Sequence, residues 1–271
     1  MSGSVRDYYE RNTRLFLALG GGGRTQSIHR AVWGPGVRTR AAALEYSNTL
    51  LAGQIPTPPA PRFALDLGCG VGGSLFSLAA RLPDLHGAGV TLSPLQVAIA
   101  RRSAARLNFE RRLTFLEADF TRLPPLPPAG LAFSIEAFVL CPDPGGYFHS
   151  AAGALAPGGR LAVIDDFLAP GADPHGPLPN AFRAGWHAAG LNTPAAADAC
   201  ARRAGFRLLE DRDLTPWLRR GPRDRLVSLA VRLGQVLRLR GEYWNSLAGG
   251  DALSRGLDGG VFTYRMLIWE I

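Results

Sequence analysis

The sequence predicts an α/β fold in which a mostly parallel sheet carries helices on both faces. After residue 62, short apolar segments typical of buried strands alternate with segments that have helical periodicity. The first of these strands, Phe63–Leu67, leads directly into a glycine-rich turn, which is followed by a helix. The chain has 271 residues, enough for one large domain, or a core domain with a small cap, with a sizeable core.

Seven strands are expected. Six of them alternate with helices, at residues 63–67, 87–91, 113–117, 131–135, 160–167 and 206–210. Neighbouring parallel strands of this kind are joined by right-handed crossovers. The seventh, Val261–Ile271, follows a long helical stretch at 215–247 and is expected to add to the sheet as an antiparallel edge strand.

The helices between the strands have recognisable start and stop signals. Ser93 precedes Pro94 and is a plausible N-cap for a helix that ends at Leu107. Thr193 and Pro194 begin another helix in the same way. Two further helices are expected at 74–81 and 147–155, the second of which stops at the sequence Ala-Pro-Gly-Gly.

Two segments lie outside the alternating pattern. Residues 1–58 read as mostly helical and are expected to form a lid over a core that spans residues 59–271. Residues 168–192 are rich in proline and glycine and interrupt the alternation after the fifth strand. Insertions at this edge of an α/β sheet commonly cover a ligand, so we expect this one, with its helical part, to cover the active site.

Composition excludes several classes of function. The net charge is +8 and all thirty basic residues are arginines, but no dense basic run with interleaved aromatic residues suggests a nucleic-acid partner. No apolar run approaches the roughly eighteen residues that a membrane span needs. The three cysteines have no metal-ligand spacing, and the first residues lack the apolar core of a signal peptide. We expect a cytoplasmic protein with a small-molecule substrate. The composition is compatible with a homo-oligomer.

The glycine turn is the clearest binding feature. Gly68, Gly70 and Gly72 remove every Cβ where the chain must turn, so that backbone N–H groups can face a ligand closely. Asp66 lies at the end of the preceding strand. In open α/β sheets, nucleotide-like ligands bind at this place. The alternative is a plain strand–turn–helix corner without a ligand.

The residues at the ends of the next two strands narrow the class of ligand. After the second strand there is no acid of the kind that holds the ribose of a nicotinamide cofactor, which disfavours a dehydrogenase; Thr91, Ser93 and Gln96 are available instead. After the third strand, Asp119 could accept from an exocyclic amine while Phe120 packs on a purine. For Asp119 and Phe120, the alternative is an aspartate that caps a helix and a phenylalanine that packs in the core.

Taken in this order, the motifs resemble those of class I S-adenosylmethionine-dependent methyltransferases. Residues 65–72 are similar to the motif that holds the methionine part of the cofactor, residues 118–120 to the adenine-side motif, and residues 155–160 to the turn before strand five. Residues 89–96 are similar to the ribose-side motif of the branch that includes sterol, tocopherol-type and prenyl-diphosphate C-methyltransferases, because Thr91 stands where many members carry an acid.

The resemblance implies a Rossmann-like methyltransferase sheet and S-adenosylmethionine as the cofactor. The residues that it places at the cofactor are Asp66, Gly68, Cys69, Gly70, Thr91, Leu92, Gln96, Asp119 and Phe120.

Glu136 is the candidate catalytic residue, just past the fourth strand. Methyl transfer to an alkene leaves a carbocation, and a base must then remove a proton; a carboxylate among apolar neighbours supplies the base and stabilises the cation. The resemblance implies this role, because C-methyltransferases of sterols and prenyl diphosphates have a glutamate in a similar segment. The alternative is a carboxylate that caps a helix or pairs with an arginine.

The acceptor would lie against residues of the two outlying segments. Aromatic side chains there would present π faces to a cation, and the glycine-rich segment 20–36 and the insertion would supply donors to a diphosphate. The alternatives are core packing for the aromatic residues and a hinge for the glycines. The residues expected to bind the acceptor are Tyr8, His29, Arg30, Trp33, Phe138, Arg183, Trp186 and His187, the last three from Arg183 on sharing one helix face.

The sequence thus predicts an S-adenosylmethionine-dependent C-methyltransferase of an isoprenoid, first of all a prenyl diphosphate. Mg²⁺ would then enter by bridging diphosphate oxygens, since no carboxylate cage for a metal is readable. Two alternatives stay open. One is an O- or N-methyltransferase of a phenolic or aminated compound, with His29 or His187 as the base. The other is a non-catalytic subunit that only binds the cofactor.

Overall fold

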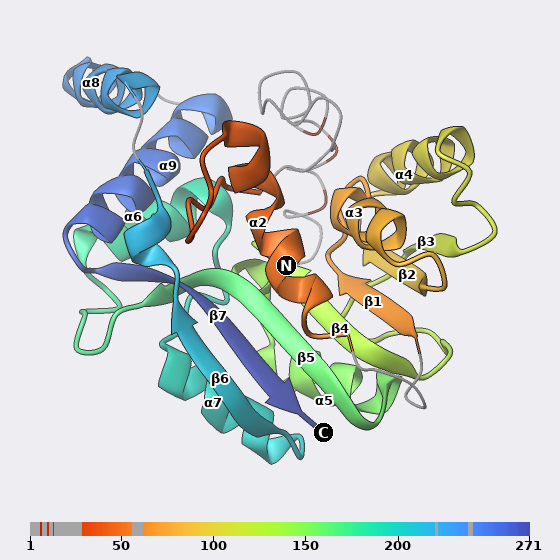
Figure 1. The fold of residues 1–271 in the computed structure, drawn as a ribbon. Coiled ribbons are helices and arrows are strands. Elements are labelled where there is room, and N and C mark those ends of the chain that lie inside the picture. Colours follow the sequence, from red (N-terminus) through yellow and green to blue (C-terminus); the bar gives the residue numbers. More distant parts are fainter. Residues whose placement is uncertain are drawn as a thin grey trace.

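The sheet organises the molecule (Figure 1). The computed structural model describes Arg6, Glu10, Thr13 and residues 29–55, 62–219, 222–237 and 241–271. Within this part, seven strands form one sheet in the order β3-β2-β1-β4-β5-β7-β6. The predicted α/β fold with a mostly parallel sheet is confirmed. The strands are β1 (Phe63–Leu67), β2 (His86–Thr91), β3 (Leu113–Glu117), β4 (Ala129–Ile135), β5 (Leu155–Leu168), β6 (Arg207–Asp213) and β7 (Phe262–Glu270).

The last strand, β7, does not lie at the edge, and that expectation was wrong. It is antiparallel to both β5 and β6 and lies between them, so that β6 forms the edge. The physical reason is burial. In β7 the run from Met266 to Trp269 is buried without interruption, as an interior strand requires. In β6, charged residues are frequent and no side chain is fully buried, which suits an edge.

Most helices begin close to their expected positions. Ser93 caps its helix as predicted, because its Oγ accepts a hydrogen bond from the N–H of Gln96 at 3.1 Å, and Thr193 does the same for Ala196 at 3.2 Å. The stretch 215–247 contains a short 3-10 turn and parts of two helices. The helices are α2 (Arg40–Ala52), α3 (Gly73–Arg81), α4 (Pro94–Arg106), α5 (Pro144–Ala154), α6 (Pro177–Trp186), α7 (Pro194–Arg203), α8 (Pro222–Val236) and α9 (Glu242–Asp258), with 3-10 turns η1 (Phe138–Leu140) and η2 (Thr215–Trp217).

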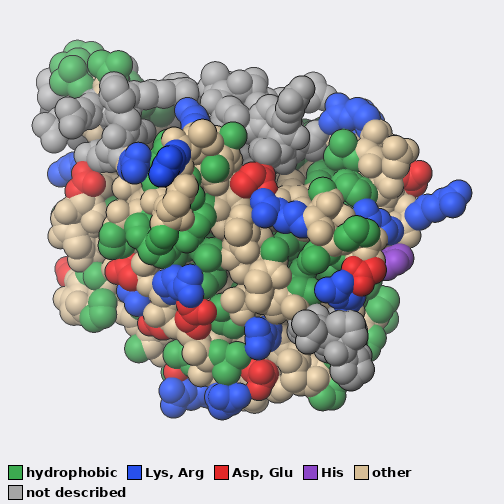
Figure 2. Space-filling view, in the orientation of Figure 1, with side chains coloured by type: hydrophobic (Ala, Val, Ile, Leu, Met, Phe, Trp, Pro, Cys, Tyr) green, Lys and Arg blue, Asp and Glu red, His purple; other side chains and the backbone are tan. Residues whose placement is uncertain are grey.

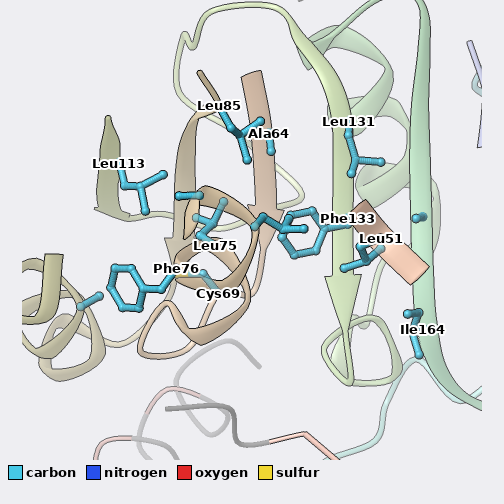
Figure 3. Close-up of a cluster of buried hydrophobic side chains, with 14 of the residues drawn as sticks. Leu51, Ala64, Cys69, Leu75, Phe76, Leu85, Leu113, Leu131, Phe133 and Ile164 are labelled. Atoms are coloured by element: carbon cyan, nitrogen blue, oxygen red, sulfur yellow. The ribbon is translucent and has the colours of Figure 1, made fainter. Parts of the chain in front are cut away.

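Helices cover both faces of the sheet. Helices α2, α3 and α4 pack on one face, where Leu51 and Leu75 meet Ala64 and Phe133 of the strands (Figure 3). Helices α5 and α7 pack on the other face. The chain runs from β1 to β2 and β3 on one side and then crosses back to β4 on the other side of β1. In α/β sheets such a switch point opens a crevice at the carboxyl ends of the strands.

A third apolar cluster joins α6 and α9 beyond the ends of β5 and β7. It contains Leu168, Phe182, Leu253 and Phe262, all buried. Helix α6 is the helical part of the segment that interrupts the alternation after β5. Among the described residues, no helix combines the length and the apolar character needed to cross a membrane.

Candidate cofactor and acceptor site

The glycine turn between β1 and α3 has an open side. All three glycines have positive φ, at 95° for Gly68, 52° for Gly70 and 90° for Gly72. A Cβ at Gly68 would lie 2.5 Å from the Cβ of Ala137, and one at Gly72 would lie 2.7 Å from the ring of Phe115. At Gly70, in contrast, a Cβ would have no neighbour among the described residues within 4 Å. Two glycines therefore serve packing, and Gly70 borders free space beside the N-terminus of α3.

Asp66 and Cys69 lie buried on either side of the turn's start. Burial alone raises the pKa of Asp66 well above its ordinary value. Burial, together with the nearby Asp66 carboxylate, also raises the pKa of Cys69, so this thiol is not a reactive nucleophile. A positively charged ligand group close to this desolvated carboxylate would stabilise its ionised form.

The predicted ribose-side residues lie together at the end of β2. The hydroxyl of Thr91 donates to Oε1 of Gln96 at 2.7 Å and accepts from the N–H of Ser93 at 3.3 Å. Nε2 of Gln96 donates to the hydroxyl of Thr13 at 3.1 Å. Leu92, between these residues, is half-buried. Thr91 and Gln96 are thus bonded to one another and to protein groups, and their role at the ribose stays a prediction.

Three residues near the N-terminus reach the same edge of the sheet. The carboxylate of Glu10 accepts from Oγ of Ser93 at 2.5 Å and from the N–H of Leu95 at 3.1 Å. Arg6 forms an ion pair with Glu117 at 3.0 Å. These three residues therefore contact the carboxyl ends of β2 and β3, where the ribose-side residues lie. Tyr8, predicted to bind the acceptor, lies outside the described residues.

The adenine-side pair has local partners. Oδ1 of Asp119 accepts from the N–H of Thr121 at 2.9 Å and from its hydroxyl at 2.8 Å. These bonds close a turn and not a helix, so they are not the helix cap considered as the alternative. Phe120 is only partly buried and meets the ring of Tyr147 edge-on, with 5.3 Å between centroids. The ring of Phe120 is therefore placed at the border of the core, with part of its surface accessible.

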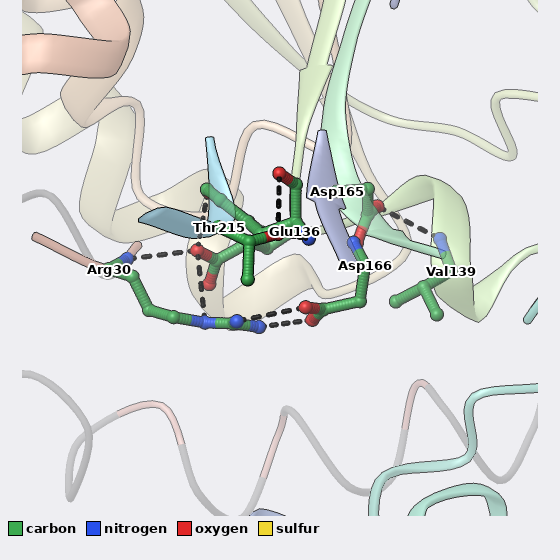
Figure 4. Close-up of polar contacts among 7 residues, drawn as sticks. Arg30, Glu136, Val139, Asp165, Asp166 and Thr215 are labelled. Carbon is green, nitrogen blue, oxygen red and sulfur yellow. Dashed lines mark hydrogen bonds and ion pairs between the residues drawn. The ribbon is translucent and has the colours of Figure 1, made fainter. Parts of the chain in front are cut away.

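Glu136 is the centre of a polar cluster at the end of β4 (Figure 4). Its φ is 54°, a left-handed conformation that is uncommon outside glycine. Its Oε1 accepts from the backbone N–H of Arg30 at 2.9 Å and from the hydroxyl of Tyr264 at 2.9 Å. The following residue, Ala137, packs on Gly68, so the cluster adjoins the glycine turn.

Arg30 links Glu136 to Asp166 of β5. Its guanidinium donates to both carboxylate oxygens of Asp166 and has Nε 3.6 Å from Oε1 of Glu136. It also lies 4.7 Å from the centroid of the Tyr264 ring. Burial opposes the charge of Arg30, but Asp166 and Glu136 outweigh burial and raise its pKa above the ordinary value. Arg30 is therefore a fixed cation, bound to carboxylates of the protein.

Asp165 fixes the backbone around the cluster. Its Oδ2 accepts from the N–H of Val139 at 2.9 Å, which holds η1, and its Oδ1 accepts from the N–H of Asp166 at 2.8 Å. Burial raises the pKa of Asp165 well above its ordinary value. Sequence analysis did not single out Asp165, Asp166 or the contact of Tyr264. The signal that would have identified Asp165 and Asp166 is the occurrence of two consecutive acids at the end of an apolar strand.

Two other predicted acceptor residues lie near Arg30. Nδ1 of His29 is 3.3 Å from the carbonyl oxygen of Arg30, while its Nε2 is buried and has no hydrogen-bond partner among the described residues. The backbone N–H of Trp33 donates to the backbone carbonyl of Trp217 at 2.7 Å. The guanidinium of Arg219 lies 4.3 Å from the centroid of the Trp33 ring.

The remaining acceptor predictions are corrected. Phe138 is 1 % exposed and packs among core aromatic rings, 4.9 Å from Tyr147 between centroids, so it has no open face for an acceptor. Arg183 donates to the carbonyls of Pro174 and Leu191, which ties down the loops around α6 instead of offering free donors.

Trp186 is engaged by α9, and His187 does not share a helix face with Arg183. Nε1 of Trp186 donates to the carbonyl of Ser246 at 3.0 Å, which fastens α6 to α9. His187 lies beyond the last helical residue and has a φ of 55°, so helical spacing does not extend to it. Among the described residues, no group of three or more potential metal ligands comes together.

Comparison with known proteins identifies the family. Residues 64–159 match a family described as methyltransferase domain. An O-methyltransferase of Pyrenophora dematioidea is 31% identical over 227 residues, which cover 81% of this chain and 77% of that protein. The chain belongs to the S-adenosylmethionine-dependent methyltransferases. The family resemblance seen in the sequence motifs is therefore confirmed.

Other methyltransferases match over shorter regions. A trans-aconitate 2-methyltransferase of Methylobacterium radiotolerans is 39% identical over 167 residues, which cover 61% of this chain. A sterol 24-C-methyltransferase of Aspergillus fumigatus is 28% identical over 164 residues, 56% of this chain and 43% of that protein. The chain spans 58%, 53% and 44% of the length of three curated relatives, two of them trans-aconitate 2-methyltransferases.

Solved structures of methyltransferases share the whole fold. A geranyl diphosphate methyltransferase in complex with GPP and sinefungin has a TM-score of 0.79 at 17% identity, covering 99% of this chain and 98% of that one. A geranyl diphosphate C-methyltransferase of Streptomyces coelicolor, solved with Mg²⁺, has a TM-score of 0.77 at 16% identity, covering 99% and 97%. The [4+2]-cyclase SpnF has 0.76 at 22% identity, covering 100% and 96%. These likenesses show the fold.

Proposed function

We propose that this methyltransferase moves the methyl group of S-adenosylmethionine to an alkene carbon, and that Glu136 receives the proton released afterwards. The observation that carries the proposal is the position of Glu136. It lies at the end of β4, one residue from Ala137, which packs on the glycine turn. A base at this point would lie between the cofactor and an acceptor that enters from the carboxyl edge of the sheet.

The glycine turn fits the proposed cofactor. The free space at Gly70 admits a ligand against the backbone and the N-terminus of α3. The buried carboxylate of Asp66 suits the positive charge of a methionine moiety. S-Adenosylmethionine would supply a methyl group that its sulfonium already activates, so positioning is the main task of the protein.

One carboxylate oxygen of Glu136 is available to accept a proton. The hydrogen bonds from Arg30 and Tyr264 both fall on Oε1, and among the described residues none falls on Oε2 (Figure 4). We assign the proton to Oε2. Bonding of the methyl group to one alkene carbon uses the π electrons and leaves the neighbouring carbon positive; loss of a proton to Oε2 restores a double bond. The proton then leaves to water.

The charge balance of the cluster favours a cation. Glu136 and Asp166 provide two carboxylates against one guanidinium, that of Arg30, so the cluster carries an excess of negative charge. In a site from which water is excluded, such fixed charges stabilise a carbocation more strongly than they would in water. The ring of Tyr264 adds a π face beside the same cluster.

The proposed acceptor is an isoprenoid, first of all a prenyl diphosphate. Geranyl diphosphate methyltransferases among the structural neighbours and sterol C-methyltransferases among the relatives support this class. The negative cluster would repel a diphosphate, so the alkene end must lie at Glu136 and the diphosphate away from it. Arg30 and Arg183 are bound to protein acceptors, so the proposal assigns the diphosphate and its Mg²⁺ to other residues of the predicted segment 20–36, of which residues 20–28 lie outside the described residues.

A second candidate is O-methylation, favoured by one observation. Nε2 of His29 is buried and has no hydrogen-bond partner among the described residues, so this nitrogen is available to take a proton from an acceptor hydroxyl. The O-methyltransferase among the relatives supports the same candidate. The two candidates assign the proton to different residues.

The test combines labelled S-adenosylmethionine with geranyl diphosphate, farnesyl diphosphate, a sterol and a phenol, with and without Mg²⁺. Transfer to a prenyl diphosphate that falls by about 10²-fold or more in Glu136→Gln, but not in His29→Asn, is expected. Glu117→Gln, an exposed carboxylate at the end of β3, is the control. Transfer to the phenol that is lost only in His29→Asn would favour O-methylation. Cofactor binding without transfer to any acceptor would contradict both candidates.

A further inference from the structure

Helix α8 exposes an apolar face. Its leucines Leu226, Leu229, Leu233 and Leu237, the last directly after the helix, have exposed fractions of 67%, 56%, 56% and 69%. Their spacing of three and four residues places them in one row along the helix. Among the described residues, the other exposed large hydrophobic side chains are Leu107 and Leu209, which are less exposed, at 42% and 38%, and lie on separate parts of the fold.

Packing on α9 fixes the direction of this leucine row. On the opposite side of α8, Val231 is 3% exposed, and a Cβ at Gly234 would lie 2.4 Å from the ring of Trp244. The hydroxyl of Ser228 donates to Asp251 of α9 at 2.5 Å. Figure 1 places α8 at the outer end of the molecule, and Figure 2 shows hydrophobic atoms gathered at the same corner.

The positive charge of the protein is concentrated in the same segment. Residues 219–240 contain seven arginines and one aspartate, which is a net charge of +6 out of +8 for the whole chain. The other 249 residues carry only the remaining +2. An amphipathic helix with exposed leucines and a strong excess of arginine is typical of segments that lie in the surface of an anionic bilayer.

We propose that α8 is a lipid-binding helix that docks this protein on the surface of a membrane containing anionic lipids. The leucine row would enter the boundary between headgroups and acyl chains, and the net charge of +6 carried by residues 219–240 would attract the segment to anionic headgroups. The charge argues against a second copy of the chain as the occupant, because self-association through this row would bring two segments of +6 together. The proposal does not depend on the acceptor of the methyl group.

The test is co-sedimentation of the full chain with vesicles of phosphatidylcholine alone and of phosphatidylcholine with phosphatidylglycerol. We expect binding to the anionic vesicles, weakened by salt, and at least about tenfold less binding to neutral ones. Replacing the four leucines of the row by serine should lower binding by about tenfold or more. Leu107→Ser with Leu209→Ser is the matched control, because these leucines are exposed outside α8.

Circular dichroism and cofactor binding report whether the variants keep their fold. Since the leucines are exposed, we expect both to stay unchanged. Equal binding to both kinds of vesicle, no binding to either, or anionic binding that survives loss of the leucines would overturn the proposal. So would a dimer in analytical ultracentrifugation that disappears with the leucine row while vesicles are not bound, since the occupant would then be a second copy.

Discussion

At the scale of single residues, the site depends on carboxylates that are expensive to keep charged. Asp66, Asp165 and Asp166 are almost fully buried, and only Asp166 has an arginine beside it. Glu136 pays a further cost of roughly 1 kcal/mol for its left-handed backbone. Proteins tolerate such costs in free energy where charged side chains have a function. Here these side chains surround the place proposed for two successive cations, the sulfonium and the carbocation.

Asp166→Asn tests the role of the ion pair as a positioning device. The substitution leaves the buried guanidinium of Arg30 with Glu136 as its remaining carboxylate, so Glu136 should be held more tightly and become a poorer base. We expect a loss of about 3–5 kcal/mol in the free energy of unfolding, the usual result of breaking a buried pair. We also expect a lower kcat with a shifted pH profile, which a purely structural defect would not produce.

The control for this prediction is Glu270→Gln, which breaks the exposed pair with Arg207. An exposed pair is worth at most about 1 kcal/mol, so stability and the pH profile should hardly change. Urea unfolding gives the stabilities and steady-state rates give the profiles. An Asp166→Asn protein with an unaltered pH profile would show that the pair only supports the fold.

Asp66 gives a prediction about pH. Its pKa in the folded protein is raised, so its contribution to stability is fully present below the pKa of the unfolded chain and is lost as pH rises through the folded pKa. Above that range, Asp66→Asn should therefore be more stable than the wild type in the absence of cofactor. S-Adenosylmethionine should reverse the order, because its positive charge would pair only with the ionised carboxylate. Melting temperatures across pH, with and without the cofactor, measure both effects; an unchanged order with cofactor would contradict the role of Asp66.

At the scale of elements, local signals predicted well and long-range pairings did not. The glycine turn, the cap at Ser93 and the strand Leu113–Glu117 follow from residues that are close in sequence. The place of β7 does not, because it depends on which of two strands, β6 or β7, has the more apolar faces. The partners of Arg30 were equally hidden: its contacts to Glu136 and Asp166 span 106 and 136 residues.

The same limit explains the errors in the acceptor site. Trp186 and Arg183 have the residue types of a binding surface, and nothing nearby in sequence shows that Ser246, Pro174 and Leu191 already take their donors. Phe138 was predicted to bind the acceptor because it is aromatic. The 3-10 turn η1 directs its ring into the core instead.

The glycine turn gives a paired prediction for this scale. Gly72→Ala should destabilise the protein by about 2–4 kcal/mol, because it adds left-handed strain to a clash with Phe115. Gly70→Ala meets no neighbour and should cost only about 1 kcal/mol. Its methyl group would instead occupy the space proposed for the cofactor, so binding of S-adenosylmethionine should fall tenfold or more. Denaturant unfolding and calorimetric titration separate the two effects; tight binding by Gly70→Ala would place the cofactor elsewhere.

At the scale of the whole molecule, the N-terminal segment is proposed to close over the cofactor. Glu10 accepts two hydrogen bonds at the start of α4, beside the ribose-side residues. Glu10→Ala should therefore speed dissociation of the cofactor by about 100-fold or more, since each of the two lost bonds to a charged group weakens closure by about 1.5–3 kcal/mol. Arg6→Ala, which removes an exposed pair with Glu117, is the matched control and should have little effect. Equal rates for the two variants in stopped-flow experiments would argue against a closing segment.

The cluster around Glu136 also sets the order in which parts of the site form while the chain is being synthesised. Its members stand at positions 30, 136, 166 and 264, and the last belongs to the strand that completes the sheet between β5 and β6. Contacts of such long sequence separation form late in folding. While residue 264 is still inside the ribosome, the glycine turn can already fold, but Glu136 lacks the hydroxyl that orients it. A nascent chain should therefore gain its cofactor pocket before it gains the ability to use it.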